Sequence, residues 1–298
     1  DSRGPAVRVV DRALLDARLT EAARRAGAIV REGQSVTALE PPSARGGPFV
    51  LHTREGGRFE ARDYVVGADG ASSLIGRTLR GPVEGRRPAV GLQIRVPYED
   101  LGPGEPPCSM RVHFGLVPWG YGWVFPAGDH AVIGIGAMIA GTGGPALLRS
   151  ELYALARASG VPGEGRSYPL EGAVILMQGA GAGMGRGRVF LCGDAAGLVD
   201  RVSGEGIPAA VESGLLCASA ILDGGDRREM IVRAWRGCLG RTVSSKLCGI
   251  LLYHPRFAAR AIRRLGESEK FYRAYWELLS GKLTYGRMIL GLATQGRG

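Results

Sequence analysis

The chain of 298 residues is long enough for one large domain or two smaller ones, and its 45% apolar and 22% charged residues are typical of a globular protein. This composition excludes a disordered chain and a fibrous repeat, and no apolar run reaches the roughly 20 residues of a membrane-spanning helix. The net charge of +10 comes from residues 226–298, which hold 15 basic and 5 acidic side chains.

The start of the chain and its cysteines indicate the compartment. The first residues, DSRGPAVRVVDR, contain no apolar core of a secretory signal, and no Met opens the chain, so we expect a preceding segment to be missing. The five cysteines are odd in number and form no C-x-x-C pair, which is typical of reduced thiols buried as small apolar groups. We therefore expect a cytoplasmic protein.

The first 80 residues predict an α/β arrangement. A strand over residues 7–10 precedes a helix over 12–25, which Asp11 caps and Gly27 ends. A second strand is expected to begin at Ala28. One face of the helix is expected to be buried through Leu14, Leu15, Leu19 and Ala23.

The rest of the chain predicts a sheet followed by helices. Further strands are expected at 35–39 and 49–53, with a glycine turn at 56–57. Residues 88–138 alternate in polarity between Pro/Gly turns, as an antiparallel sheet does. Thereafter we expect a helix at 145–158, a strand at 188–192 running through a turn into a long helix to about Leu222, and basic amphipathic helices to the end.

A first motif, DYVVGADGASSLIGR, lies at residues 63–77. A buried strand ends at Gly67, Asp69 and Gly70 form a turn, and a helix is expected from Ser72 or Ser73. Small residues let backbone approach a ligand, and a carboxylate accepts hydrogen bonds from sugar hydroxyls. The same pattern also describes an ordinary strand–turn–helix.

A second motif, RVFLCGDAAGLVDRVSGEGIPAAVESG, lies at residues 188–214. Gly193 and Asp194 follow a strand, and Gly204 and Gly206 place flexible backbone nearby. A carboxylate beside the N–H groups of a helix start is suited to a polyol and to a group that becomes negative. The pattern predicts a binding corner.

A third motif, VPWGYGWVFPAGDHAVIGIGA, lies at residues 117–137. Alternation with period two places Tyr121, Trp123 and Phe125 on one face of a strand. An aromatic wall suits a long apolar chain, but such a ladder is also common in a protein core.

Together the three motifs resemble the FAD-dependent geranylgeranyl reductase family, within the p-hydroxybenzoate-hydroxylase-like flavoproteins. The first two are similar to the flavin motifs of that superfamily, and Y-x-W-x-F-P, ending at Pro126, is similar to the reductases' own signature. The resemblance implies a substrate-binding role for Tyr121, Trp123, Phe125 and Pro126. It implies an oxidoreductase in which FAD, reduced by NAD(P)H or another donor, passes hydride to an isoprenoid C=C bond.

The resemblance also implies the residues that contact FAD. Arg12 matches a contacting arginine and Val36 a backbone contact near adenine, while Asp194, Gly206 and Ile207 match ribityl and isoalloxazine contacts. Arg201 departs from the family, where Pro is common. The cofactor residues expected are Arg12, Val36, Asp69, Gly70, Gly193, Asp194, Gly204, Gly206 and Ile207.

The family's opening G-x-G-x-x-G fingerprint, which holds the pyrophosphate, is absent. Gly134 and Gly136 lack the third small residue, and the spaced glycines of 178–187 do not fit either. We therefore expect the chain to begin after the first βαβ portion of its domain, not to hold FAD stably and to be inactive alone. The proton donor is unassigned: Ser203 and Glu205 are candidates, whereas His113 and His130 are better explained as structural.

The fold expected is α/β with α+β character, in three parts. Residues 1–85 and 186–225 form an incomplete FAD-binding Rossmann-like domain, residues 86–185 an antiparallel-sheet substrate domain, and residues 226–298 a basic helical region. That region is expected either to contact an anionic membrane or to be a solvated face; neither nucleic acid nor a metal is expected. The alternative functions are a flavin monooxygenase and a non-catalytic isoprenoid- or lipid-binding protein.

Overall fold

The computed structural model describes residues 9–80, 88–102, 109–139, 143–176, 184–222, 242–280 and 282–288. The chain divides into two compact units, each assembled from separate stretches of sequence. The first unit contains Asp1–Leu14, Arg87–Ile175 and Val243–Gly298, and the second contains Leu15–Arg86 and Leu176–Thr242. The described elements are mixed α and β, as the sequence predicted.

The first unit is built on a five-stranded sheet of order β6-β7-β8-β5-β9. Strands β5 to β8 pair as antiparallel neighbours, which confirms the expectation for residues 88–138. The strands are β5 (Pro88–Pro97), β6 (Arg111–Phe114), β7 (Gly120–Ala127), β8 (His130–Met138) and β9 (Glu171–Leu176), with short 3-10 turns η1 (Tyr98–Asp100) and η2 (Pro162–Gly165) beside them.

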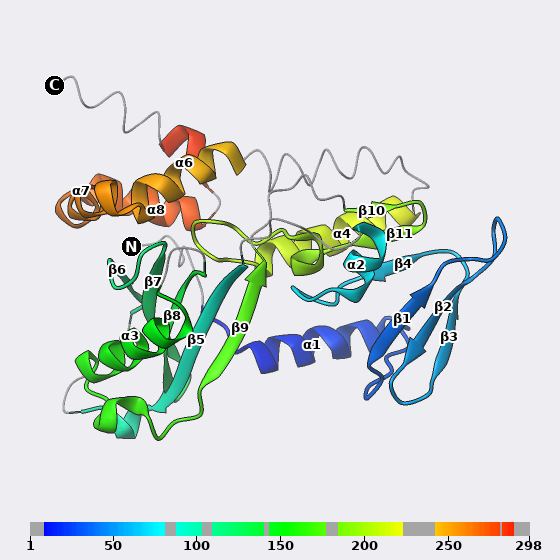
Figure 1. Cartoon of the computed structure of the whole chain (residues 1–298), viewed down its shortest axis with the longest axis horizontal. Coiled ribbons are helices and arrows are strands. Elements are labelled where there is room, and N and C mark those ends of the chain that lie inside the picture. The colour runs from blue at the N-terminus through cyan, green and yellow to red at the C-terminus, as the bar shows by residue number, and fades with distance from the viewer. Residues whose placement is uncertain are drawn as a thin grey trace. The chain divides into compact units, whose positions relative to one another are not determined.

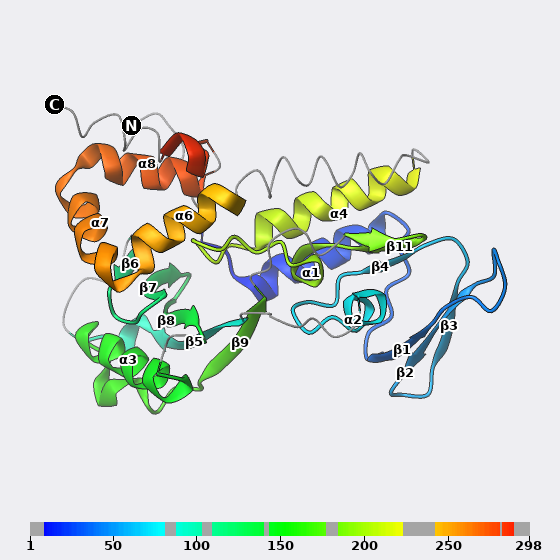
Figure 2. The ribbon, with the colours of Figure 1, turned by 45° about the horizontal axis from the view of Figure 1, so that its top comes forward.

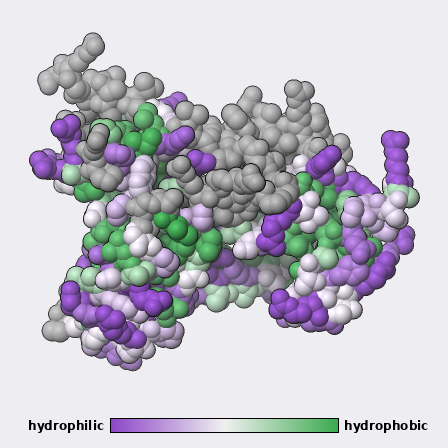
Figure 3. Space-filling view, in the orientation of Figure 1, coloured by the Kyte–Doolittle hydropathy of each residue, from purple (hydrophilic) through white to green (hydrophobic). Residues whose placement is uncertain are grey.

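One face of this sheet packs against helix α3 (Pro145–Ala158), as predicted, and forms the core of the unit (Figure 1). The core side chains alternate along the strands, with Ile94 on β5 and Ile133 on β8 fully buried. Leu148 and Leu152, one helical turn apart, close the core from α3. The outer side of α3 is hydrophilic (Figure 3).

The C-terminal part of the first unit is helical, as predicted. Helices α6 (Thr242–Tyr253), α7 (Pro255–Glu267) and α8 (Glu269–Leu279) follow one another beside β6 and β7 (Figure 2). Ile262 of α7 lies close to the turn at Gly115, after β6. Residues 226–241 and 289–298 of the predicted basic region lie outside the described residues.

The second unit contains two small sheets. Strands β1 (Val36–Glu40), β2 (Phe49–Thr53) and β3 (Arg58–Ala61) form an antiparallel sheet, and Gly56 takes a φ of 84° in the β2–β3 turn. The other sheet has the order β10-β11-β4, in which β11 (Val189–Leu191) runs parallel to β4 (Val65–Gly67) and antiparallel to β10 (Gly185–Arg186).

Three helical elements accompany the parallel pair of strands. Helix α2 (Leu74–Arg80) follows β4, the 3-10 turn η3 (Gly193–Ala196) follows β11, and α4 (Ile207–Leu222) comes after a ten-residue loop. The core of the unit joins Val65, Phe190 and Leu191 of the sheet to Ile75 of α2 and Cys217 of α4.

The two strands expected near the start of the chain do not form among the described residues, and residues 7 and 8 lie outside them. Val9 and Val10 lie in no strand, and the segment from Ala28 is a loop in which Ile29 is 82% exposed. Helix α1 (Arg12–Arg25) has the predicted bounds but buries no residue, Leu14 and Leu19 included. The long helix expected after the turn begins at Ile207 and ends at Leu222, as predicted for its end.

Candidate functional site

The first motif forms a tightly bonded turn at the carboxyl end of β4. Asp69 accepts hydrogen bonds from the Ser73 hydroxyl (2.5 Å) and from the backbone N–H of Ile75 (3.1 Å). Gly70, with a φ of 74°, takes the left-handed conformation that glycine adopts most readily. The Asp69 carboxylate therefore stabilises the start of α2. This structural role explains in part why an aspartate occupies the position.

The second motif lies beside the first because β4 and β11 are parallel neighbours. Leu191 pairs with Gly67, and the backbone N–H of Cys192 donates to the Gly67 carbonyl at 3.1 Å. Burial raises the pKa of the Cys192 thiol, and the charge of Asp69 adds to the effect. Both motif turns thus meet at one edge of the sheet, where ligands of α/β folds bind.

Asp194 lies in η3, next to the start of α4. A Cβ atom built on Gly206 would lie 3.1 Å from Asp194 Oδ1, so the carboxylate approaches the glycine backbone closely. Gly193, at a φ of 54°, donates its N–H to the buried Ser213 hydroxyl of α4 at 2.9 Å. The structure brings Gly193, Asp194 and Gly206 together in a corner of small residues, with Ile207 next in the chain.

The loop between η3 and α4 is closed by Asp200. Its Oδ1 accepts from the N–H groups of Val202 and Ser203, both at 2.9 Å, and from the Ser203 hydroxyl at 3.1 Å. The Asp200 N–H donates to the Glu205 carbonyl at 2.9 Å, and Gly204 takes a φ of 72°. The Ser203 hydroxyl is therefore part of the turn, which makes it a poor proton donor.

Arg201, the departure from the family pattern, is half-buried in this loop. Burial lowers the pKa of its guanidinium, and its Nε atom has no contact with solvent and no hydrogen-bond partner among the described residues. Arg12 begins α1 with an exposed side chain, and Val36 begins β1, in another sheet. The grouping of Arg12 and Val36 with the corner stays a prediction.

The third motif forms an aromatic row on β7. Tyr121 and Trp123 have ring centroids 5.8 Å apart, and Trp123 and Phe125 6.3 Å apart. We call these three residues the aromatic shelf. They lie on the sheet face opposite α3, whereas Pro126 alternates onto the face of the buried Val124.

The ring of Trp123 lies against three glycines, Gly91, Gly134 and Gly136, which we call the glycine floor. A Cβ atom on Gly134 would lie 2.2 Å from the Trp123 ring, on Gly136 3.4 Å, and on Gly91 3.8 Å. The indole therefore lies across β8 and reaches β5; a Cβ atom would clash with it at Gly134 and would only touch it at Gly136 and Gly91. Glycines spaced by two on β8 were visible in the sequence, but the contribution of Gly91 depends on strand register and was missed.

Aromatic residues from the C-terminal helices contact one end of the shelf. Tyr253 of α6 stacks with Tyr121 at 6.4 Å and 19° between ring planes. Phe114 of β6 lies 6.1 Å from Tyr121 and 5.9 Å from Tyr275 of α8. Tyr253 and Tyr275 were missed by sequence reasoning because they lie more than 110 residues after the motif.

The described residues thus form two candidate sites, one in each unit: a corner of small residues with a carboxylate, and a row of aromatic rings. Of the two histidines read as structural, His113 has its pKa lowered by burial and by nearby Arg111. In the part of the chain that the structure describes, no group of three His, Cys, Asp or Glu side chains could hold a metal ion. Among the same residues, no helix is long and apolar enough to cross a membrane.

Comparison with known proteins points to flavoproteins. Residues 1–100 match the family described as FAD binding domain. The chain is 32% identical over 233 residues to the chloroplastic geranylgeranyl diphosphate reductase of Nicotiana tabacum, which covers 75% of this chain and 49% of the relative. It is 32% identical over 262 residues to the menaquinone reductase of Mycobacterium tuberculosis, which covers 83% of this chain and 62% of the relative.

The chain spans about half the length of the geranylgeranyl diphosphate reductases it matches. A solved structure of a geranylgeranyl bacteriochlorophyll reductase-like protein from Thermoplasma acidophilum superimposes with a TM-score of 0.72 at 20% identity. The match covers 95% of this chain and 74% of that one. At that identity the likeness shows the fold, which is that of FAD-binding oxidoreductases.

Proposed function

Because the chain belongs to the FAD-dependent geranylgeranyl reductase family, we propose that it is part of a flavin oxidoreductase that reduces C=C bonds of a prenyl chain. The observation that carries the proposal is the aromatic shelf on its glycine floor. A row of three adjacent aromatic rings is suited to contact an extended, unsaturated hydrocarbon. The substrates named for relatives carry that hydrocarbon on a diphosphate or a quinone.

The residues of the corner suit FAD. Asp194 would accept hydrogen bonds from the ribityl hydroxyls, and the backbone of Gly204, Gly206 and Ile207 would lie against the isoalloxazine ring. A Cβ atom on Gly206 would lie only 3.1 Å from Asp194 Oδ1, so glycine lets the carboxylate and this backbone lie close together. When bound and reduced, FAD would supply hydride to the alkene, and NAD(P)H is the reductant we propose.

The work of the protein in this reaction is positioning and exclusion of water. Trp123 and Phe125 would fix the plane of the prenyl chain, and apolar contact would hold it in place without a charged anchor. Tyr253 and Tyr275 would cover the end of the chain nearest Tyr121. In such a site the favourable free energy of binding the tail comes from burial of apolar surface, at about 25 cal/mol per Å².

The basic C-terminal helices are proposed to contact an anionic membrane, from which a prenyl lipid would be taken. On α7, Arg260 and Arg263 are exposed beside Phe257, itself 45% exposed, and the outer end of the helix is hydrophilic (Figure 3). Basic and aromatic side chains on one helix are typical of an interfacial surface. The opposite side of α7 carries Ile262, which packs inward near Gly115.

The proposal is tested by Trp123→Ala in the full-length, FAD-loaded protein of which this chain is part. We expect the bound flavin per protein to be unchanged and prenyl turnover at low substrate to fall at least about tenfold, since a large buried contact is removed. Trp119→Ala is the matched control, because Trp119 lies just before β7 and packs against His254 instead of the glycine floor. Loss of flavin with unchanged use of prenyl substrate would refute the assignment.

A further inference from the structure

A row of polar side chains lies on the same sheet face as the aromatic shelf. Trp123 of β7 pairs with Gly134 of β8, and Gly134 pairs with Gln93 of β5, so Trp123 and Gln93 share one face. Arg95, two residues after Gln93, shares that face and lies in line with Phe125. Crossing the sheet from β7 to β5 therefore leads from apolar rings to hydrogen-bonding groups.

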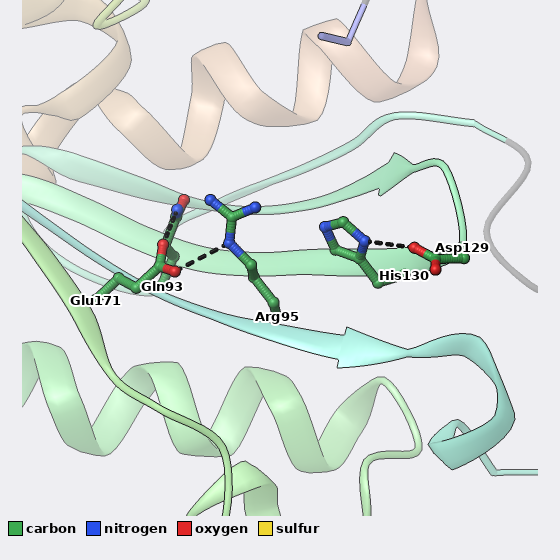
Figure 4. Close-up of polar contacts among 5 residues, drawn as sticks. All are labelled: Gln93, Arg95, Asp129, His130 and Glu171. Carbon is green, nitrogen blue, oxygen red and sulfur yellow. Dashed lines mark hydrogen bonds and ion pairs between the residues drawn. The ribbon is translucent and has the colours of Figure 1, made fainter. Parts of the chain in front are cut away.

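Glu171 of β9 holds the two β5 side chains in place. The Gln93 amide donates to Glu171 Oε2 at 2.7 Å, and Arg95 Nε donates to Glu171 Oε1 at 2.9 Å. Only the Nε edge of the guanidinium is used, and the Arg95 side chain remains 42% exposed. Figure 4 shows its two Nη groups pointing away from Glu171, between the Gln93–Glu171 pair and His130.

His130 of β8 lies at the far end of the row (Figure 4). Its Nδ1 is 2.9 Å from Asp129 Oδ1, and the ring is only 17% exposed. The other ring nitrogen, Nε2, has no contact with solvent and no hydrogen-bond partner among the described residues. We call Gln93, Arg95, His130 and Glu171 the polar row. It presents to a ligand the Nη groups of Arg95, which point away from Glu171.

The charges around the polar row do not favour a phosphate. Hydrogen bonds from Gln93 and then from Arg95 hold the pKa of Glu171 below its usual value, so the carboxylate is ionised and neutralises Arg95. The Leu14 backbone N–H, and then the nearby Arg95 and His130, lower the pKa of Asp11. Asp129 is a further carboxylate. One guanidinium thus faces several carboxylates, and a diphosphate there would meet net repulsion.

We propose that the polar row binds the head of the prenyl substrate and that this head is an uncharged ring bearing carbonyl oxygens. The guanidinium Nη groups of Arg95 would donate hydrogen bonds to a carbonyl oxygen of this ring. The ring itself would lie over the apolar part of the face. This inference rests on the proposed function, because it assumes that the aromatic shelf holds the prenyl tail.

The test compares three ligands with the same tail. Geranylgeraniol, geranylgeranyl diphosphate and a naphthoquinone bearing a geranylgeranyl chain are titrated calorimetrically into the protein in one non-ionic detergent. We expect the quinone to bind at least about tenfold more tightly than the diphosphate, the size of one hydrogen bond to a charged donor. Tighter binding of the diphosphate would overturn the proposal.

Variants of the polar row sharpen the test. Arg95→Met should remove the preference for the quinone and leave geranylgeraniol affinity unchanged, whereas Glu171→Gln, which frees the guanidinium charge, should raise diphosphate affinity. Arg111→Met is the matched control, because Arg111 pairs with Val124 and lies on the opposite sheet face. An unchanged quinone preference in Arg95→Met, or an equal change in Arg111→Met, would contradict the proposal.

The outcome also separates this inference from the function on which it rests. If geranylgeraniol binds and Trp123→Ala abolishes its binding, the shelf holds the tail. Equal affinities for the two heads would then overturn the head-group proposal alone. If none of the three ligands binds to the FAD-loaded protein, both proposals fail.

Discussion

Glu171 determines the charge of the polar row, and its ionisation makes the stability of the first unit depend on pH. Its pKa is lowered from 4.5, first by the Gln93 hydrogen bond and then by Arg95. A carboxyl group with a lowered pKa in the folded state contributes stability that is present above the unfolded pKa. That contribution is lost as the pH falls through the folded pKa.

We therefore predict that the variant Glu171→Gln loses less stability on acidification than the wild type does. The difference between the two should be constant near neutral pH and shrink as the pH falls below 4.5. The measurement is the free energy of unfolding in urea at a series of pH values. Glu99→Gln, at an exposed position of η1, is the control. A wild-type advantage that grows on acidification would contradict the pairing of Glu171.

Ser213 is the residue that fixes the binding corner to α4. Its hydroxyl accepts from the Gly193 N–H at 2.9 Å and donates to the Ala209 carbonyl at 2.6 Å. We predict that Ser213→Ala lowers the free energy of unfolding by about 1–3 kcal/mol, because a buried N–H loses its acceptor. Ser219→Ala, exposed on the same helix, should change it by less than about 0.5 kcal/mol. Equal effects in a urea titration would show that the Gly193 bond is dispensable.

The individual residues show how far the sequence could predict the candidate site. Asp69, Asp194 and Trp123 stand out because each lies in a local pattern of turn glycines or alternating aromatics. The contacts of Glu171 with Gln93 and Arg95 join positions more than 70 residues apart. Such contacts depend on the order of strands in the sheet, which local periodicity does not encode.

At the scale of elements, the glycines of strand β8 leave space for the ring of Trp123. A Cβ atom on Gly134 would lie 2.2 Å from Trp123 and could be accommodated only by moving the indole. We predict that Gly134→Ala costs about 1–3 kcal/mol of stability, as overpacking does, and also weakens prenyl binding. Urea unfolding and calorimetric titration with geranylgeraniol measure the two effects.

The control for this substitution is a glycine with open space around it. Gly214 lies within α4, and an added Cβ atom would meet nothing within 4 Å. Gly214→Ala should therefore leave prenyl binding unchanged and stabilise the helix by up to about 1 kcal/mol. If Gly134→Ala bound geranylgeraniol as the wild type does, the glycine floor would have no role in the site.

The elements predicted correctly are those whose own pattern fixes them. Alternation of polar and apolar residues predicted strands β5 to β8. The Asp11 cap and the stop at Gly27 predicted the bounds of α1. The strands expected at 7–10 and from Ala28 have apolar composition but no pairing partner, and Ile29 is 82% exposed. A strand is stabilised by the strands that pair with it, so apolar composition alone predicts too many strands.

At the scale of the whole molecule, the positive charge is separate from the part of the sequence that carries the flavin motifs. Residues 226–298 hold all of the net charge of +10. The units also do not follow the order of the sequence, since Val243–Gly298 belong to the same unit as Arg87–Ile175. Composition could show where the charge lies, but the assembly of the helices against β6 and β7 required the structure.

We predict that binding to vesicles of anionic lipid falls steeply as the salt concentration rises, because exposed charges are screened within about 10 Å at 0.1 M. Replacing both Arg260 and Arg263 by Gln should weaken sedimentation with the vesicles at low salt. Arg149→Gln, on the exposed side of α3, is the control and should have no effect. Binding that is insensitive to salt would indicate apolar insertion, and the absence of binding would leave a solvated basic face.

The central claim is that a prenyl chain on the aromatic shelf is reduced, and the mass of the reaction product tests it most directly. The full-length, FAD-loaded protein of which this chain is part is incubated with prenyl substrate and NAD(P)H, with and without oxygen, and the lipid is analysed by mass spectrometry. Our account predicts a gain of two hydrogens per reduced bond, with reductant consumed in the same ratio and no need for oxygen. Oxygen-dependent consumption with an oxygen atom in the product, or an unchanged lipid, would contradict it.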